Sequence, residues 1–232
     1  MFFDFSDDVK IIARKDSGIR TGLDLKGKRV GTPSGTTGQF FLGAYLSYNT
    51  LSASDIEVID IKPSKLPNAL NSNQVDAIVI WEPHAYLAQE LLQDNAIRLP
   101  SSEVYRETFN FMVMNDFARK RPEALKRFLS AIQKATTFIK NRKEEAQNIV
   151  AKRLNLEKKI MVTLWDDFVF KISLDQSLIT TLEDEARWAI HNKLTEKSEV
   201  PDYLNYIVPA ALKAINPEVV TVIHNWQGVH EN

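Results

Sequence analysis

The segment Gly31-Thr32-Pro33-Ser34-Gly35-Thr36-Thr37-Gly38 has the residue types of an anion-binding turn. It follows a short β-like run and precedes a helix expected from about Thr36 to Tyr48. Glycine lets a backbone approach a ligand closely, and a helix N-terminus carries about half a positive charge, which favours an anion. Its hydroxyls and free N–H groups can donate to the same oxygens. We therefore expect a ligand to contact Thr32, Ser34, Gly35, Thr36 and Thr37. The alternative is that the hydroxyls only cap the helix.

The pattern differs from two known catalytic or phosphate-binding loops. A P-loop needs Gly-Lys-Ser/Thr at the start of a helix, whereas Gly27-Lys28-Arg29 comes before an expected strand. A nucleophile elbow needs a glycine two residues before and two after its serine. Gly31 lies three before Ser34, and Gly35 is adjacent to it.

A second candidate is the segment Trp81-Glu82-Pro83-His84, again at the end of a strand. Trp81 can form an apolar wall of a pocket, and Glu82 can receive a cationic group. In the alternative, Trp81 belongs to the core and Glu82 complements the dipole of a helix that Pro83 opens. Both segments follow strands expected in one sheet, and ligands of open α/β sheets sit at the carboxyl ends of the strands.

Composition excludes several other functions. The net charge of -1 gives no basic face for a nucleic acid, and 44% hydrophobic with 25% charged residues is ordinary for a globular protein. With no cysteine and only four histidines, none in a metal-binding motif, we expect no metal and no cofactor. No apolar run reaches the length of a membrane span. The start, Met1–Asp8, lacks the basic region of a signal peptide.

The first half of the chain alternates strand and helix patterns. The expected strands are residues 9–14, 29–32, 56–61, 75–80 and 95–99, and the expected helices are 36–48, 67–71 and 83–93. This alternation is typical of an α/β unit with a largely parallel sheet.

The second half is mostly helical after one more expected strand at 110–114. Asp116 and Pro122 mark helix starts, and apolar residues then repeat at intervals of three and four. Asp175 is the expected N-cap of a later helix. The remaining expected elements are helices at 143–154, 175–192 and 209–215 and a strand at 219–223.

Several segments, in this order, resemble the periplasmic solute-binding proteins of sulfonate, taurine and nitrate-type ABC transporters, a family that includes pyrimidine-precursor-binding and synthesis proteins. They are Asp24–Gly31 with the loop that follows it, Val75-Asp76-Ala77 with Trp81-Glu82-Pro83, Phe117 to Pro122-Glu123-Ala124, Leu182–Trp188, and Pro217–Thr221. The similarity covers nearly the whole chain.

The resemblance implies a type II periplasmic-binding-protein-like α/β fold, with two lobes that close on a ligand. Residues 15–106 would form one complete lobe, and residues 1–14 and 107–232 would supply crossover strands and the helical remainder of the other. Family members begin with a signal peptide and an α/β half-lobe, so we expect the first lobe to be incomplete here. Its uncovered apolar surface would then promote self-association.

The function that follows from the resemblance is non-enzymatic capture of a small anionic or zwitterionic solute, such as an alkanesulfonate or taurine, for an ABC permease. The location implied is periplasmic or extracellular, as a lipid-anchored or soluble protein. A ligand-sensing module of a signalling protein and a pyrimidine-precursor binding or synthesis protein are the alternatives. The synthesis branch relies on a cysteine-containing motif, and this chain has no cysteine.

Overall fold

The computed structural model describes residues 2–100, 104–105 and 107–223, which form two compact units. Unit 1 consists of Met1–Phe5, Thr108–Val150 and Val169–Asn232, and unit 2 of Ser6–Glu107 and Ala151–Phe168. The segment 15–106 therefore lies within unit 2, which also includes residues 6–14 and 151–168.

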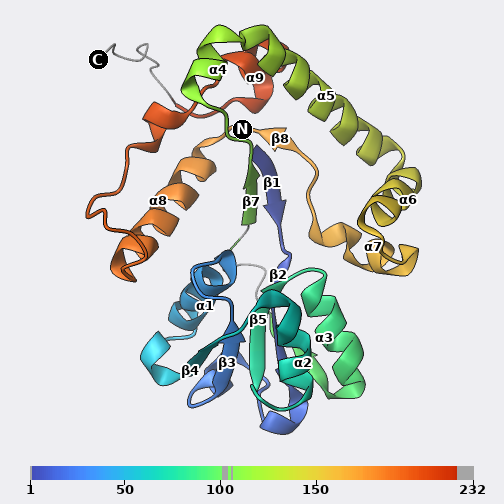
Figure 1. Ribbon diagram of the computed structural model, residues 1–232, viewed down its shortest axis with the longest axis vertical. Helices are drawn as coiled ribbons and strands as arrows, with labels where there is room; N and C mark the ends of the chain where they lie inside the picture. The colour runs from blue at the N-terminus through green and yellow to red at the C-terminus, as the bar shows by residue number, and fades with distance from the viewer. Residues whose placement is uncertain (1, 101–103, 106, 224–232) are drawn as a thin grey trace. The chain divides into compact units, whose positions relative to one another are not determined.

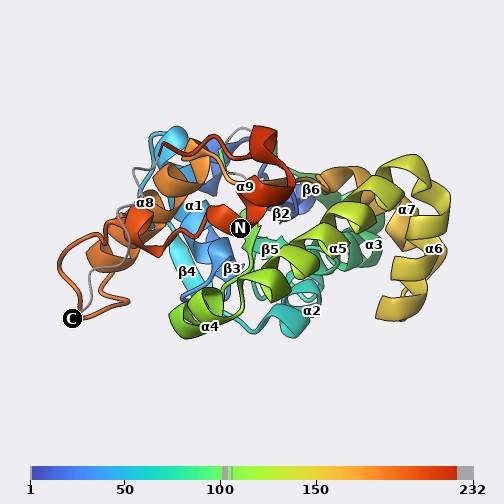
Figure 2. The same ribbon diagram turned by 90° about the horizontal axis from the view of Figure 1, so that it is seen from above.

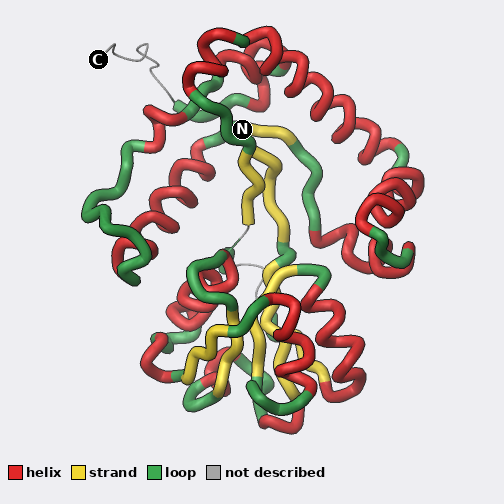
Figure 3. Tube along the Cα trace, in the orientation of Figure 1, coloured by secondary structure: helices red, strands yellow, loops and turns green. Residues whose placement is uncertain are grey.

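Unit 2 contains a five-stranded sheet with helices on both faces (Figures 1 and 3). Its strands, in spatial order, are β4 (Glu57–Asp60), β3 (Arg29–Thr32), β5 (Ala77–Trp81), β2 (Val9–Arg14) and β6 (Ala96–Arg98). β3 pairs in parallel with β4 and β5, whereas β2 pairs antiparallel with β5 and β6. Four strands thus run in one direction, which confirms a largely parallel sheet, and β2 runs against them.

The helices of unit 2 divide between the two faces of this sheet. Buried side chains of α1 (Thr37–Tyr48) form one core cluster, and those of α2 (Leu66–Asn71) and α3 (His84–Leu92) form another. After β3 the chain forms α1 on one face of the sheet, whereas after the neighbouring β5 it forms α3 on the other face. Because these two strands are parallel, their carboxyl ends lie at the same edge, and the divergence creates a topological switch point, where such sheets bind ligands.

Strand β2, within the segment 1–14 that the resemblance assigns to crossover strands, is an interior strand of unit 2. It is hydrogen-bonded on both sides, and its apolar residues enter both core clusters. The chain passes between the units just before it, at Phe5 and Ser6. A run of β-branched residues that is buried on both faces is typical of such a position.

Unit 1 contains a three-stranded sheet in the order β7 (Glu107–Asn110), β1 (Phe2–Ser6) and β8 (Ile172–Ser173). The helices of the second half of the chain are α4 (Asn115–Lys120), α5 (Pro122–Asn141), α6 (Lys143–Leu154), α7 (Lys158–Leu164), α8 (Gln176–His191) and α9 (Ala210–Ile215). Within unit 1, α9 packs against α5 (Figure 2), and both share a core cluster with α8. Asp175 caps α8 as expected, since its carboxylate accepts a hydrogen bond from the Ser177 amide.

Two expected strands differ in the structure. The strand expected at 110–114 lies earlier, at β7, and Met112 and Met114 after it are exposed. Among the described residues, 219–223 form no strand and contribute a single parallel bridge between Leu174 and Val220. The neighbouring strand β8 has only two residues. The β-branched run at 219–223 therefore has too short a partner to form a hydrogen-bonded ladder.

Candidate functional site

The hydroxyl-rich loop after β3 is held by hydrogen bonds from side chains of unit 2. The Ser34 amide donates to Asp60 Oδ1 at 2.9 Å, and the Gly35 amide donates to Gln39 Oε1 at 2.7 Å. Thr36 is the extended N-cap residue of α1, and its hydroxyl donates to the Pro33 carbonyl at 2.7 Å. The first two amides of the loop are therefore occupied by the protein itself.

The first turn of α1 remains available as a group of donors. Within the described part of the chain, no group accepts a hydrogen bond from the amides of Thr36, Thr37 or Gly38. A helix start leaves such N–H groups without intrahelical acceptors, and they carry the positive end of the helix dipole. The capacity to bind an anion thus lies in this turn.

Thr32 and Gly38 bring strand β3 and the turn into close contact. Thr32 is completely buried, and its Oγ1 has no hydrogen-bond partner among the described residues. A Cβ placed on Gly38 would lie 3.0 Å from that oxygen and 3.3 Å from the Val79 carbonyl of β5. Glycine therefore lets α1 start directly against two strands, and an unpartnered hydroxyl lies at its first turn.

Trp81 ends β5 at the same edge of the sheet, and it is half-buried. Its ring packs against the core cluster that contains the buried side chains of α1 and also against the cluster on the other face. Tyr105, which the sequence did not indicate, packs edge-to-face on Phe40 of α1 with ring centroids 5.1 Å apart. Trp81 and Tyr105 thus both pack against the core cluster that contains α1.

Glu82 has the geometry of the helix-capping alternative. Its Oε2 accepts a hydrogen bond from the Tyr86 amide at 2.8 Å, in the first turn of α3. Burial raises the pKa of this carboxyl to about 7, although the Tyr86 amide and the charge of Lys10 act in the opposite direction. The structure therefore joins Glu82 to α3 and does not show it bonded to the loop after β3.

A buried ammonium lies beside Glu82, and the sequence analysis missed it. The Lys10 side chain is fully buried, and its Nζ lies 3.0 Å from Asp167 Oδ1 and 3.3 Å from Asp7 Oδ2. Arg98 also pairs with Asp7 at 2.9 Å, in a more exposed position. The sequence contains a signal for this buried charge: Lys10 interrupts the apolar run Val9–Ala13, and this run directly follows Asp7 and Asp8. These charges hold residues 165–167 against strand β2 within unit 2.

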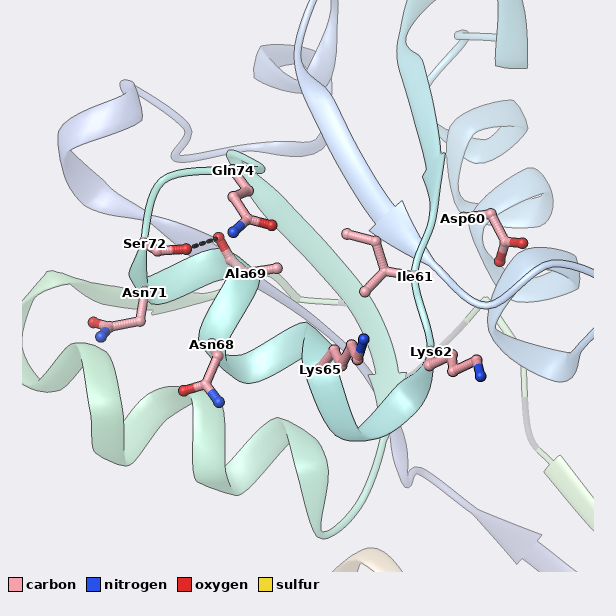
Figure 4. A pocket seen from close by; sticks show the side chains of 9 residues that line it. All are labelled: Asp60, Ile61, Lys62, Lys65, Asn68, Ala69, Asn71, Ser72 and Gln74. Atoms are coloured by element: carbon pink, nitrogen blue, oxygen red, sulfur yellow. Dashed lines mark hydrogen bonds between the residues drawn. The ribbon is translucent and has the colours of Figure 1, made fainter.

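A shallow groove of about 640 Å³ runs along α2 on the surface of unit 2 (Figure 4). It is lined by Asp60, Ile61, Lys62, Lys65, Asn68, Ala69, Asn71, Ser72 and Gln74. In Figure 4, Ile61 points toward α2, whereas Asp60 lies on the other side of the chain that continues β4. Among the residues that line the groove, Asp60 also contacts the loop after β3, through the Ser34 amide.

Neither a metal site nor a membrane span is evident in the described residues. They contain no group of three or more side chains with the donor types and placement to hold a metal ion. None of their helices combines the length and the apolar character that crossing a bilayer requires.

The fold is that of a periplasmic binding protein. The structure superimposes on the periplasmic aliphatic sulphonate binding protein SsuA of Escherichia coli with a TM-score of 0.75 and 17% identity, covering 100% of this chain and 73% of that one. It also superimposes on the desulfurization enzyme DSZB with a TM-score of 0.59 and 17% identity, covering 92% of this chain and 78% of that one. At these identities the likeness concerns the fold alone.

Residues 7–146 match the NMT1/THI5-like family, and the chain belongs to that family. A protein of Brucella abortus (strain 2308), provisionally named a binding protein, is 32% identical over 162 residues, which are 68% of this chain and 50% of that protein. A Bacillus subtilis (strain 168) protein, provisionally named an aliphatic sulfonates-binding protein, is 31% identical over 154 residues, 65% of this chain and 46% of that protein. The chain thus spans about half the length of these relatives.

Proposed function

We propose that this chain captures a small sulfonate-type anion as part of the solute-binding protein of an ABC importer. One observation carries the proposal. At the switch point of the sheet in unit 2, the amides of Thr36, Thr37 and Gly38 have no acceptor among the described residues, and the buried Thr32 hydroxyl beside them has no partner. An unmade hydrogen bond at a buried group costs about 1–3 kcal/mol. A bound anion, or the water that it holds, would supply the missing acceptors.

The Bacillus subtilis relative, provisionally named an aliphatic sulfonates-binding protein, supports the same class of ligand. A sulfonate presents three oxygens that share one negative charge, which suits converging amide donors at a helix start. By analogy with the relatives, we place the protein in the periplasm and assign it an ABC permease as partner. We propose a sulfonate as the solute.

Each candidate residue receives a role from its contacts. The amides of Thr36 and Thr37 donate to the anion, and the exposed Ser34 hydroxyl is free to turn toward it. Gly35 adopts a positive φ of 69°, a conformation that glycine allows and that the loop needs before the chain enters the first turn of α1. Trp81 packs on the carbon skeleton of the ligand. Glu82 keeps the role of helix cap that its bond to Tyr86 indicates.

Catalysis is the alternative that the fold likeness to DSZB raises. The same fold can carry unrelated functions, so this likeness alone assigns no reaction. The chain also has no cysteine thiol to act as a nucleophile. The Brucella abortus and Bacillus subtilis relatives carry binding-protein names, and we therefore propose a non-enzymatic role.

The decisive experiment removes one amide and leaves the helix intact. Thr37 is the first residue of α1, a position that proline favours, and Thr36 before it has φ −121° and ψ 171°, which proline tolerates. Thr37→Pro deletes the N–H, whereas the matched variant Thr37→Ala deletes only the hydroxyl. Calorimetry with ethanesulfonate should show binding weakened roughly tenfold or more by Thr37→Pro and less by Thr37→Ala. Equal affinity in the two variants, or no binding by the unmodified chain, would refute the proposed site.

A further inference from the structure

Asp60 places a carboxylate at the edge of the proposed anion-binding turn. It ends β4, the neighbour of β3, and its Oδ1 accepts the hydrogen bond from the Ser34 amide at 2.9 Å. The residue is exposed, and it forms no ion pair with any residue that the structure describes. An acid beside an anion site weakens the binding of a simple anion, so its presence needs an explanation.

We propose that Asp60 determines ligand specificity by receiving the ammonium group of a zwitterionic ligand whose anionic end lies on the first turn of α1. This inference rests on the proposed function, and it adds a residue and a charge preference to it. Oδ1 fixes the loop through Ser34, while Oδ2 has no described partner and remains available to an ammonium group.

The spacing suits a short ligand. Ser34, which Asp60 contacts, is two residues from Thr36, where the free amides begin. Two residues span at most about 7 Å, so the ammonium and anionic ends of the ligand would be separated by only a few bonds. An amino group two carbons away from a sulfonate meets this requirement. The buried, unpartnered Thr32 hydroxyl at the same turn is an independent sign that a ligand completes the site.

Other charged side chains near the turn do not replace Asp60. Glu82 is buried, and its carboxylate is bonded to the first turn of α3. Lys62 and Lys65 line the groove along α2 (Figure 4), and among the described residues neither forms an ion pair with Asp60. Within the described part of unit 2, Asp60 is therefore the carboxylate that contacts the loop from β4, and its Oδ2 is open to a ligand.

The test compares taurine with ethanesulfonate, which differ by the amino group alone. Calorimetry on the unmodified chain should give a dissociation constant for taurine about tenfold lower than that for ethanesulfonate. Asp60→Asn keeps an oxygen that can accept from Ser34 but removes the charge, so it should abolish this preference by weakening taurine and sparing ethanesulfonate. Glu57→Gln, which removes the same charge at the other end of β4, should leave the preference unchanged.

The outcomes distinguish the role of Asp60 from that of the anion-binding turn. If both ligands bind but the unmodified chain shows no preference, or Asp60→Asn preserves the preference, the role of Asp60 is overturned and the anion-binding turn stands. If neither ligand binds the folded chain, both proposals fail. The comparison of the two ligands on the unmodified chain needs no substitution, so a misfolded variant does not prevent the test.

Discussion

Glu82 lies at a strand end beside the candidate site, but its carboxylate caps a helix. The sequence offered two interpretations, an acid for a ligand amine or a complement to a helix dipole. The structure shows its carboxylate nearly out of solvent and bonded to the Tyr86 amide. A charged carboxylate in such a position loses most of its hydration, and one hydrogen bond compensates only in part. The protonation of this residue is therefore linked to the stability of unit 2.

The pH dependence of this linkage has a definite sign. The pKa of Glu82 is raised from 4.5 to about 7 in the folded protein, chiefly by burial. Between these values the folded state binds more protons than the unfolded state, so the free energy of unfolding falls as the pH rises. Below about pH 4.5 this penalty is absent, and above about pH 7 it is complete. The difference amounts to something on the order of 3 kcal/mol.

We expect Glu82→Gln to remove that dependence, because the glutamine oxygen still accepts from Tyr86 and never ionises. Urea denaturation at several values between pH 5 and pH 8 measures it. The variant should become more stable than the unmodified protein as the pH increases. The same substitution at exposed Glu90 of α3 is the control. Parallel stability curves for Glu82→Gln and the unmodified protein would contradict the linkage.

Among the elements, strand β2 and the 3-10 turn at Trp165–Asp167 are joined by charge. The fully buried Lys10 contacts two carboxylates, one from its own strand start and one from this turn, which follows α7. Moving an ammonium group out of water is costly, and only close opposite charges compensate for it. The ion pair therefore helps to attach residues 165–167 to β2, together with the hydrogen bond from the Asp7 amide to the Asp167 carbonyl.

Replacing Lys10 by Met should lower the free energy of unfolding by roughly 1–3 kcal/mol, because it removes the counter-charge of the half-buried Asp167, whereas Asp7 keeps its pair with Arg98. Amide hydrogen exchange should accelerate in α7 more than in α1. Arg98→Ala is the matched comparison, since Arg98 pairs with the same Asp7 but is 41% exposed, and exposed pairs contribute about 1 kcal/mol or less. Equal losses in both variants would show that burial of Lys10 is not what matters.

The elements differ in how well the sequence predicted them. Helices α1, α5 and α8 were predicted because their apolar residues repeat over several turns, and Asp175 marks the start of α8. Strand β8 was missed because two residues carry no periodicity, and β1 because acidic and apolar residues mix at the start of the chain. Helix α7 was missed as well, since its seven residues begin without a side-chain cap.

The candidate site was predictable in part for a similar reason. The loop after β3 is rich in glycine and hydroxyl residues, and β5 ends in a tryptophan that a glutamate follows. These residue types are visible in the sequence, so the sequence indicated both segments. The partner of the Ser34 amide lies 26 residues away, and Lys10 meets Asp167 across 157 residues. Contacts of that kind depend on the order of the strands in the sheet, which no local pattern contains.

On the scale of the whole molecule, unit 1 exposes several large apolar side chains within one stretch of its sequence. Met112 is 91% exposed and Met114 is 78% exposed. Four further exposed apolar residues lie nearby in the sequence, namely Phe109, Val113, Phe117 and Phe128. Apolar surface of this kind commonly marks a contact with another protein or a tendency to associate.

We expect the chain to self-associate through this surface. Light scattering should give an average mass that increases with protein concentration. The double substitution Met112→Lys and Met114→Lys should keep the protein monomeric, because burying two ammonium groups in a contact is costly. Lysines in place of exposed Leu87 and Leu91 on α3 of unit 2 provide the control. A concentration-independent monomer mass for the unmodified chain would contradict the expectation.

The division of the chain into non-contiguous units has a consequence for its synthesis. Domains generally fold in the order in which the ribosome releases them. Unit 2 is complete only when residues 151–168 join Ser6–Glu107, so all of α5, the first long helix of unit 1, is made before unit 2 can close. Until Asp167 has left the ribosome, the nascent sheet lacks one of the two carboxylates that neutralise Lys10. A protease or a chaperone that meets the growing chain would therefore encounter an open edge of unit 2 for much of translation.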